Sequence, residues 1–523
     1  MPKDDRHLIR NTLLVAASFG LAAAAGLLRN AIIAKTFGIG TQLDAYYAAF
    51  RLPDLLFTVV AGTSLSAAFV PVFAGLLAKG ERQEAWRLAS AVTNIVVVIV
   101  SVLALLIGLL APWLVRVLIA PGFDVQTRAQ TVTMMRLVLI STVIFGISAV
   151  QTNALHGFKH FLFPALAPIV YPLGIAAGVW WLPPSLGVRR LAIGAIMGAT
   201  LHLGIQVPAL LHYGFRWWPV LGLRRKPVRR VVGLMGPRVL DLGVFHLTIL
   251  ATSNLASRLG PGSVSALEWG WDAMQLPEAV IGTAFGLVAL PTLSDLAAQG
   301  DIEGLRSTLG ETLRAVLSLT VPAALGLILL GRPLLRLVYQ RGAFDTAATD
   351  AVYVALRFYA LGLVGHACVE LAARAFFAQQ DTLTPLLVTS AFAALNILLG
   401  IVLRGPLGHG GLALANSLAI SGELVTLLLI LRRRWNGVEG RQMLVTLARV
   451  CAATLVMGAT VYGVMWAGRR ADLGSLVIVA AGAVVGALAY LAAGLLLRVQ
   501  GLRWLLPLWE REGTQSGTIT QRP

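Results

Sequence analysis

Long apolar runs alternate with short polar segments along the whole chain. Each run reaches about 20 residues, the length that an α-helix needs to cross the hydrocarbon core of a bilayer. Membrane-spanning strands would instead give segments of about ten residues with period-two alternation. The runs predict about fourteen spans, with approximate bounds 11–34, 45–78, 88–119, 130–156, 161–182, 189–213, 229–258, 265–297, 303–330, 350–377, 382–404, 409–431, 443–467 and 473–498. The pattern therefore predicts an all-α polytopic membrane protein.

The composition supports this fold class. The chain has 523 residues, of which 57% are hydrophobic and 13% are charged, whereas about a quarter of the residues of a soluble protein are charged. No soluble domain interrupts the predicted spans, and the longest connection, about 214–228, follows the sixth one.

The net charge of +18 comes mainly from short loops, such as residues 79–87, 223–230 and 431–435. Lys and Arg in short loops orient helices by the positive-inside rule and contact anionic lipid. Their positions predict that both termini are cytoplasmic, although the three arginines of segment 331–342 then lie outside. Because no soluble domain presents these charges, the sequence argues against nucleic-acid binding.

An internal repeat divides the chain. Four features recur at offsets of 220 or 221 residues: Pro71 and Pro291, Asp124 and Asp345, Pro164 and Pro385, and Leu191-Ala192 and Leu412-Ala413. Each copy holds six spans, an even number, so the two copies have the same orientation, as in transporters whose substrate path lies between the halves. We expect two six-helix lobes, residues 1–222 and 223–436, an additional C-terminal helix pair at 437–505 and a cytoplasmic tail at 506–523.

Several classes of site are not indicated. Cys368 and Cys451 lie in apolar runs, which argues against a structural disulfide. The eight histidines lack ligand spacing, and no catalytic triad or nucleotide-binding loop is apparent. We therefore predict a protein that is not an enzyme and has no metal or cofactor. Energy for transport would then come from H⁺ or Na⁺ gradients, the membrane potential or consumption of the cargo.

An ordered series of motifs resembles a known family. "GLLRNAIIAKTFGIGTQLDAYYAAFRLPDLL" followed by "SAAFVPVF" is similar to the opening signature of the MurJ/MviN lipid II flippases, members of the multidrug, oligosaccharidyl-lipid and polysaccharide exporter superfamily. "APGFD", "ALAPIVYPLG", "SALEWGWDAMQLP", "VALPTLS", "YQRGAFD", "RAFFAQQDTLTP" and "GLALANSLA" continue it in the family's order. The resemblance covers the first twelve spans.

The resemblance implies a function. It implies two six-helix lobes plus a helix pair in the bacterial cytoplasmic membrane, which move undecaprenyl-pyrophosphate-linked peptidoglycan precursor outward by alternating access. The implied partners are this lipid-linked precursor, membrane lipids and cell-wall synthesis proteins. Two other interpretations stay open: an exporter of another polyprenyl-linked glycan or an ion-coupled drug antiporter with the same fold, and a transport-inactive relative that regulates cell-wall synthesis.

The resemblance also implies cationic groups for the phosphates. Arg29 matches the second of two arginines that the family's first helix usually carries six residues apart, and Ala23 occupies the first position. Phe57 stands where a basic residue is typical, and Asp272 where an arginine is typical. The candidate substrate-binding residues are Arg29, Asp44, Arg51, Asp54, Arg238 and Asp272.

Each candidate also has a structural interpretation. Arg29 would extend to the membrane surface from the end of its span, and Asp44 would stabilise the positive N-terminal dipole of the second span. Arg51 and Asp54 would form a local ion pair. Asp272, flanked by tryptophans and four residues after Glu268, would lie at the membrane interface.

Two acidic residues within apolar runs are candidates for ion coupling. They are Asp241, which is alternatively paired with Arg238, and Glu370, which is alternatively paired with Arg374 four residues later. Asp381 precedes the eleventh span and is predicted to be its N-cap.

Overall fold

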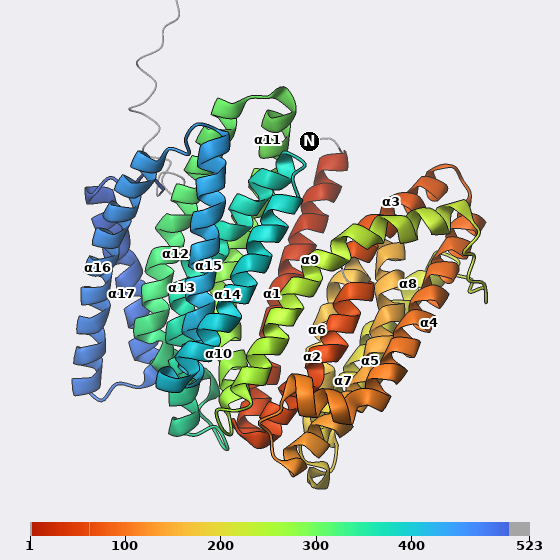
Figure 1. Cartoon of the computed structure of the whole chain (residues 1–523), viewed down its shortest axis with the longest axis horizontal. Helices are drawn as coiled ribbons and strands as arrows, with labels where there is room; N and C mark the ends of the chain where they lie inside the picture. The colour runs from red at the N-terminus through yellow and green to blue at the C-terminus, as the bar shows by residue number, and fades with distance from the viewer. Residues whose placement is uncertain (1–2, 62, 502–523) are drawn as a thin grey trace, which may run out of the picture. The chain divides into compact units, whose positions relative to one another are not determined.

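The computed structural model describes residues 3–61 and 63–501, and it describes their side chains except at 3–17, 19, 61, 63–64, 232, 234–242, 283 and 287. The first elements are α1 (Lys3–Phe37), α2 (Thr41–Ala61), α3 (Thr63–Ala78), α4 (Arg82–Leu114), η1 (Val115–Ile119), α5 (Val125–Gly157), α6 (Leu162–Trp181), η2 (Pro184–Leu186), α7 (Arg189–Gly204), α8 (Val207–His212) and α9 (Lys226–Ala256) (Figure 1). Those that follow are α10 (Ser263–Glu278), η3 (Ala279–Thr283), α11 (Ala284–Gln299), α12 (Ile302–Tyr339), α13 (Thr346–Ala378), α14 (Leu383–Leu407), α15 (His409–Arg434), α16 (Gly440–Arg470) and α17 (Ser475–Leu496).

The predicted all-α fold is confirmed. Among the described residues, every regular element is helical, and 12 helical segments are long and apolar enough to cross a membrane. The helices α1, with 35 residues, and α9, with 31, occupy the two other predicted spans. Helices suit this environment because they satisfy their backbone hydrogen bonds internally.

One predicted boundary is wrong. Helix α12 continues to Tyr339, beyond the predicted end at residue 330, so Arg332 and Arg336 lie on a helix rather than in a loop. Arg332 Nε donates to Asp350 Oδ1 on α13 at 2.6 Å. This ion pair compensates the charge of Arg332, which the sequence predicted to lie in a loop outside the membrane.

The chain packs into two compact units. Unit 1 comprises the described residues up to Ala266 together with Tyr339–Ala348, and unit 2 comprises Leu267–Val338 and the described residues from Thr349 onward. Helix α9 belongs to unit 1 because it packs against α2 and α3. The lobe boundary predicted between residues 222 and 223 follows the repeat, whereas this division follows packing, so the lobe assignment stays a prediction. The predicted tail, 506–523, lies outside the described residues.

The repeated residues have matching structural roles. Asp124 Oδ1 accepts a hydrogen bond from the Thr127 N–H at the start of α5, at 2.7 Å. Asp345 Oδ1 accepts one from the Ala348 N–H at the start of α13, at 2.8 Å. Both carboxylates thus cap a helix N-terminus, where backbone donors lack partners within the helix.

The second span of each repeat carries two prolines at matching places. In the first repeat, Pro53 and Pro71 lie within the helical segment Thr41–Ala78. In the second, Pro277 and Pro291 lie within the segment Ser263–Gln299, which contains the π-helical turn η3. A proline inside a helix removes one backbone hydrogen bond, so both spans share the same local irregularities.

Glycines bring α6 and α7 into direct backbone contact. A Cβ atom on Gly174 would lie 2.3 Å from the Gly198 Cα, and one on Gly178 would lie 2.6 Å from the Gly194 Cα. Each helix therefore presents a small-xxx-small motif to the other, the arrangement that permits close packing of membrane helices. This contact fixes the positions of the polar side chains on α6 and α7.

In unit 2, the last helix pair is joined to α12 by polar contacts. The Tyr490 hydroxyl on α17 donates to the Ser318 carbonyl oxygen. Arg314, which is 6% exposed, pairs with Glu439 just before α16. A buried apolar cluster that includes Leu313, Phe376 and Leu427 joins α12 to α13 and α15.

Candidate functional site

Asp44 caps the N-terminus of α10. Its side chain is 1% exposed. Asp44 Oδ2 accepts from the Gly262 N–H at 2.6 Å, and Oδ1 accepts from the N–H and the hydroxyl of Ser265, both at 2.7 Å. The carboxylate therefore stabilises the start of a different helix from the one that carries it. Its predicted role in substrate binding stays a prediction.

The end of α1 contacts the loop between α12 and α13. The Ala343 N–H donates to the Lys35 carbonyl oxygen at 2.9 Å. Two glycines permit this approach: a Cβ on Gly38 would lie 2.4 Å from the Ala343 oxygen, and one on Gly342 would lie 2.3 Å from the Lys35 oxygen. Asp44 and these glycines together join α1 and α2 to residues of the second repeat within unit 1.

Arg29 is held by its neighbour. Its Nε and Nη2 atoms donate to Asn30 Oδ1 at 3.0 and 2.8 Å, and Asn30 is 6% exposed. The Tyr171 hydroxyl on α6 lies within electrostatic range of both Arg29 and Asp54. The guanidinium is thus oriented among polar groups inside unit 1.

Arg51 has different surroundings from Arg29. Its charge acts on His246 of α9, and α2 and α9 pack together. The side chains of Arg238 and Asp241 lie outside the described residues. Their predicted roles therefore stay predictions.

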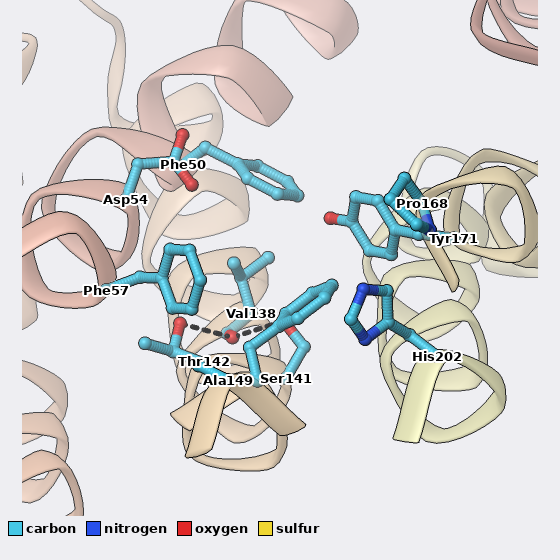
Figure 2. A pocket seen from close by; sticks show the side chains of 11 residues that line it. Phe50, Asp54, Phe57, Val138, Ser141, Thr142, Ala149, Pro168, Tyr171 and His202 are labelled. Carbon is cyan, nitrogen blue, oxygen red and sulfur yellow. Dashed lines mark hydrogen bonds between the residues drawn. The ribbon is translucent and has the colours of Figure 1, made fainter. Parts of the chain in front are cut away.

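Asp54 borders a cavity in unit 1. The cavity has a volume of about 360 Å³ and lies between α2, α5, α6 and α7. Its lining residues are Phe50, Asp54, Phe57, Val138, Ser141, Thr142, Phe145, Ala149, Pro168, Tyr171 and His202 (Figure 2). Arg29, Arg51 and Asp44 are not among them. Of the candidate substrate-binding residues with described side chains, Asp54 alone lines it.

Unit 2 contains a second polar cluster. Arg374 Nη2 donates to Glu370 Oε1 on the same helix, which confirms the predicted pair. Glu278, near the end of α10, is a second carboxylate within electrostatic range of Glu370. A Cβ on Gly286 would lie 2.7 Å from the central carbon of the Arg374 guanidinium, so this glycine provides room for the side chain.

Asp272 lies half-buried on α10. The neighbouring Trp271 packs its ring edge against Tyr359 and His366 of α13, with centroid distances of 5.3 and 5.0 Å. His366 Nε2 is 3.0 Å from Asn416 Oδ1 on α15. Trp271 therefore packs within the helical bundle of unit 2 rather than at its surface.

Asp381 supplies the predicted capping hydrogen bond at the start of α14, although it lies one residue before the N-cap position, which Thr382 occupies. Its Oδ1 accepts from the Thr384 N–H at 2.9 Å, and Arg434 Nη1 donates to its Oδ2 at 2.6 Å. Desolvation opposes ionisation, but the bonds from Thr384 and Arg434 outweigh it and lower the pKa of Asp381 to about 2.

Sequence reasoning missed several polar residues of these sites. Tyr171 and His202 line the cavity, and Glu278 accompanies Glu370. All three interrupt apolar runs, and an ionisable side chain within a membrane span faces protein or a polar cavity by default. An isolated ionisable residue within an apolar run is visible in the sequence, so Glu278 and His202 could have been predicted as site residues from this pattern.

Comparisons with known proteins identify relatives over most of the chain. The profile of the family described as "Lipid II flippase MurJ" matches residues 33–484. A Burkholderia cenocepacia protein named "Lipid II flippase MurJ" is 31% identical over 442 residues, which cover 83% of this chain and 85% of that protein. A Thermotoga maritima protein named "Probable lipid II flippase MurJ" is 27% identical over 95% of this chain and 98% of its own length.

Solved structures share the fold. One described as "Lipid II flippase MurJ, inward closed conformation" superposes with a TM-score of 0.77 at 23% identity, covering 93% of this chain and 99% of that one. An inward-facing multidrug transporter of the MATE family superposes with a TM-score of 0.67 at 14% identity, covering 80% and 95%. The length and continuity of the profile match decide the assignment: the chain belongs to the lipid II flippase MurJ family.

Proposed function

We propose that this protein is a flippase that moves lipid II across the bacterial cytoplasmic membrane by alternating access. The observation that carries the proposal is the family match over residues 33–484, which spans both copies of the internal repeat. The multidrug transporter similarity, at 14% identity, supports the fold alone.

Arg29 and Arg51 are the cations that we assign to the pyrophosphate, with Arg238 as a third. A phosphate group cannot enter hydrocarbon unaided, because an uncompensated charge there costs several kcal/mol or more. Arginine offers a planar fork that makes paired, charge-assisted hydrogen bonds with phosphate oxygens. The Asn30 amide oxygen supports this role because it fixes the Arg29 side chain before the cargo arrives.

Alternating access would require the hydrogen bonds of Asp44 to break and re-form. Three hydrogen bonds join α2 to the start of α10, which belongs to the second repeat. Any state in which the two repeats separate at this end must break them. We assign them to the state in which this end of the transport path is closed.

The function is tested by depleting a host's own lipid II flippase while this chain is expressed. A membrane-impermeant hydrolase that acts on lipid II measures how much precursor reaches the outer leaflet. We expect the chain to restore outer-leaflet lipid II and Arg29→Ala to reduce the rate about tenfold or more, since a charge-assisted contact contributes about 1.5–3 kcal/mol. Arg29→Lys keeps the charge and should be intermediate. Arg357→Ala, at an exposed arginine on α13, is the matched control. Unrestored outer-leaflet lipid II at normal protein levels would refute the proposal.

We infer that H⁺ or Na⁺ drives the cycle, with Glu370 as one coupling group and Asp241 as a second candidate. Glu278 and Glu370 carry two negative charges near the single positive charge of Arg374. One proton or sodium ion would balance this cluster. Dissipating each gradient separately while lipid II exposure is followed will identify the ion. If Glu370→Gln responds to both gradients as the wild type does, Glu370 has no coupling role.

The finer assignments of topology and partners are proposals too. Cytoplasmic termini are supported by Arg6 and Arg10 before the first apolar run and by Arg498 after the last. A C-terminal reporter that is active only outside the cytoplasm should remain inactive. Cell-wall synthesis proteins are candidate partners because they consume the exported precursor, and crosslinking in intact cells followed by mass spectrometry tests for them.

A further inference from the structure

Arg136 is an arginine on the lipid-facing side of a membrane-spanning helix. It lies on α5, which packs against α4 (Figure 1), and its side chain is exposed. Its apolar neighbours are exposed too: Leu105 and Leu109 on α4 are 63% and 65% exposed, and Ile140 on α5 is 50% exposed. This surface therefore faces lipid. Since ionisable residues within spans almost always face protein or a polar cavity, the position of Arg136 calls for a partner at the lipid surface.

A proline on α4 fixes the direction of the Arg136 guanidinium. Pro112 has no N–H group, so the Gly108 carbonyl oxygen lacks the donor that the residue four positions later supplies in a regular helix. Arg136 Nε donates to that oxygen at 2.9 Å. Among the described residues, this is the only hydrogen bond of the Arg136 side chain. The two Nη atoms therefore keep the planar pair of donors that matches the geometry of a phosphate group.

The depth of Arg136 matches the headgroup layer of a bilayer. Helix α5 has 33 residues and is about 50 Å long, whereas the hydrocarbon core is about 30 Å thick. A centred helix of this length extends about 10 Å beyond the core at each end. Arg136 lies about 16 Å from the start of α5 at Val125, so its Cα is about 6 Å inside the edge of the core. A guanidinium at this depth can extend to the phosphates of the nearer leaflet.

The charge at this end of α4 and α5 favours an anionic partner. Between residues 108 and 157 the sequence has three cations, Arg116, Arg128 and Arg136, and a single acid, Asp124. The carboxylate of Asp124 is engaged as the cap of α5. The only acid of α4, Glu84, lies at the other end of that helix. A net positive charge at a membrane surface attracts anionic lipid headgroups.

The second repeat has an arginine at the same place but in different surroundings. Arg357 on α13 follows Arg136 by 221 residues, the offset of the repeat, and is also exposed. Its guanidinium lies over the ring of Phe358, 4.9 Å from the centroid. Asp350, two helical turns before Arg357, adds a carboxylate to that face of α13, whereas Ala129 occupies the matching position of α5. Arg357 thus provides a natural comparison for Arg136.

We propose that Arg136 binds the phosphate group of an anionic phospholipid, of the phosphatidylglycerol class, at the lipid-facing surface between α4 and α5. The Nη atoms donate paired, charge-assisted hydrogen bonds to the phosphate oxygens, while the Gly108 carbonyl oxygen holds Nε. The acyl chains lie along Leu105, Leu109 and Ile140, which are exposed beside it. This lipid belongs to the surrounding bilayer and is not the cargo, so the site is additional to the proposed flippase function.

A photoreactive lipid reports this contact locally. The purified full chain is placed in phosphatidylcholine nanodiscs that contain a small fraction of phosphatidylglycerol with a diazirine close to the headgroup. After irradiation, peptide mass spectrometry measures the label on residues 105–116 and 132–140. We expect at least about tenfold more label than with a phosphatidylcholine of the same design, because the net positive charge favours the anionic headgroup. An excess of inorganic phosphate should leave the label unchanged, since a free ion gains nothing from the apolar surface.

Three variants locate the site. Arg136→Gln removes the charge and should lower the phosphatidylglycerol label about tenfold or more, since hydrogen bonds to charged groups are among the stronger ones. Arg136→Lys keeps the charge but loses the planar fork, so its label should be intermediate. Arg357→Gln, at the matching position of the second repeat, is the control and should leave the label on α4 and α5 unchanged. Thermal unfolding verifies the fold of each variant, and Arg136→Lys decides if Arg136→Gln does not fold.

Four results would overturn the proposal. Equal labelling by the two lipids would indicate unspecific contact with the bilayer, and loss of the label to inorganic phosphate would indicate a site for the free ion. The other two are undiminished labelling of the folded Arg136 variants and an equal decrease in Arg357→Gln. Lipid II exposure is measured in a separate assay, so failure here leaves the flippase proposal standing.

Discussion

Replacing Asp44 should loosen the start of α10. In Asp44→Ala, the N–H groups of Gly262 and Ser265 lose their acceptor in a region where Asp44 is 1% exposed. The Ser265 hydroxyl keeps an acceptor, the Gly262 carbonyl oxygen at 3.2 Å. Two unsatisfied buried donors cost about 1–3 kcal/mol each, so we expect a local loss of about 2–6 kcal/mol.

Amide hydrogen exchange measures this loss directly. Each 1.4 kcal/mol of local destabilisation accelerates exchange about tenfold, so the amides of Gly262 and Ser265 should exchange at least about tenfold faster in Asp44→Ala. Asp44→Asn keeps one acceptor oxygen but turns its NH₂ group toward a donor, so its effect should be smaller. Asp295→Ala, at an exposed acid, is the matched control and should change neither amide.

The same variant tests the assignment of Asp44 to the closed state. If the three bonds stabilise that state, Asp44→Ala should also lower the rate of lipid II exposure, whereas Ser265→Ala, which removes only the hydroxyl bond, should lower it less. Unchanged exchange at Gly262 and Ser265 in Asp44→Ala would refute the structural reasoning. Faster exchange with a normal flipping rate would refute only the role in transport.

Three further substitutions test other contacts. Gly198→Ala places a Cβ 2.5 Å from the backbone carbonyl oxygen of Tyr171, so thermal unfolding should show a loss of stability of about 1–3 kcal/mol. The control Gly204→Ala, whose added Cβ would have no atom within 4 Å, should lose far less stability. Asp381 has a pKa lowered from 3.8 to about 2, so its contribution is complete above pH 4 and disappears as the pH falls through 2. Asp381→Asn should therefore reduce stability by less than about 1 kcal/mol at pH 7, and the loss should diminish as the pH falls from 4 through 2, as measured by unfolding temperature. Tyr490→Phe removes the hydroxyl that donates to the backbone carbonyl oxygen of Ser318. It should lower the unfolding temperature by an amount equivalent to about 1 kcal/mol.

The spans and the repeat were predictable because their causes are local. A helix that crosses a bilayer needs about 20 apolar residues, and such runs are visible without tertiary information. Asp381 was predictable as a cap because its acceptor role involves the Thr384 N–H three residues away. The extra length of α12 was not, because Arg332 is stabilised there by Asp350 of another helix.

The partner of Asp44 was beyond sequence reasoning. The sequence offered two interpretations of Asp44, substrate binding or stabilisation of its own helix, but its donors at Gly262 and Ser265 are 218 and 221 residues away. Cap patterns such as an acid before a helix identify local donors only. The cavity was missed for a different reason. Helices that are apolar on all sides carry no polar stripe to distinguish one face from another, so the sequence does not indicate which face Phe57 or Phe145 presents to the interior.

Phe57 changes what the cationic residues of this chain must do. Its ring lines the cavity of unit 1 and packs against the Phe145 ring, with the two centroids 5.6 Å apart. A basic residue, which the family resemblance predicts at this position, would instead add a positive charge to the helix that carries Arg51. Ala23 and Asp272 also stand where the resemblance predicts basic side chains. Under the proposed function, the phosphate contacts then rest on fewer cations, so removal of Arg29 or of Arg51 should lower the flipping rate strongly.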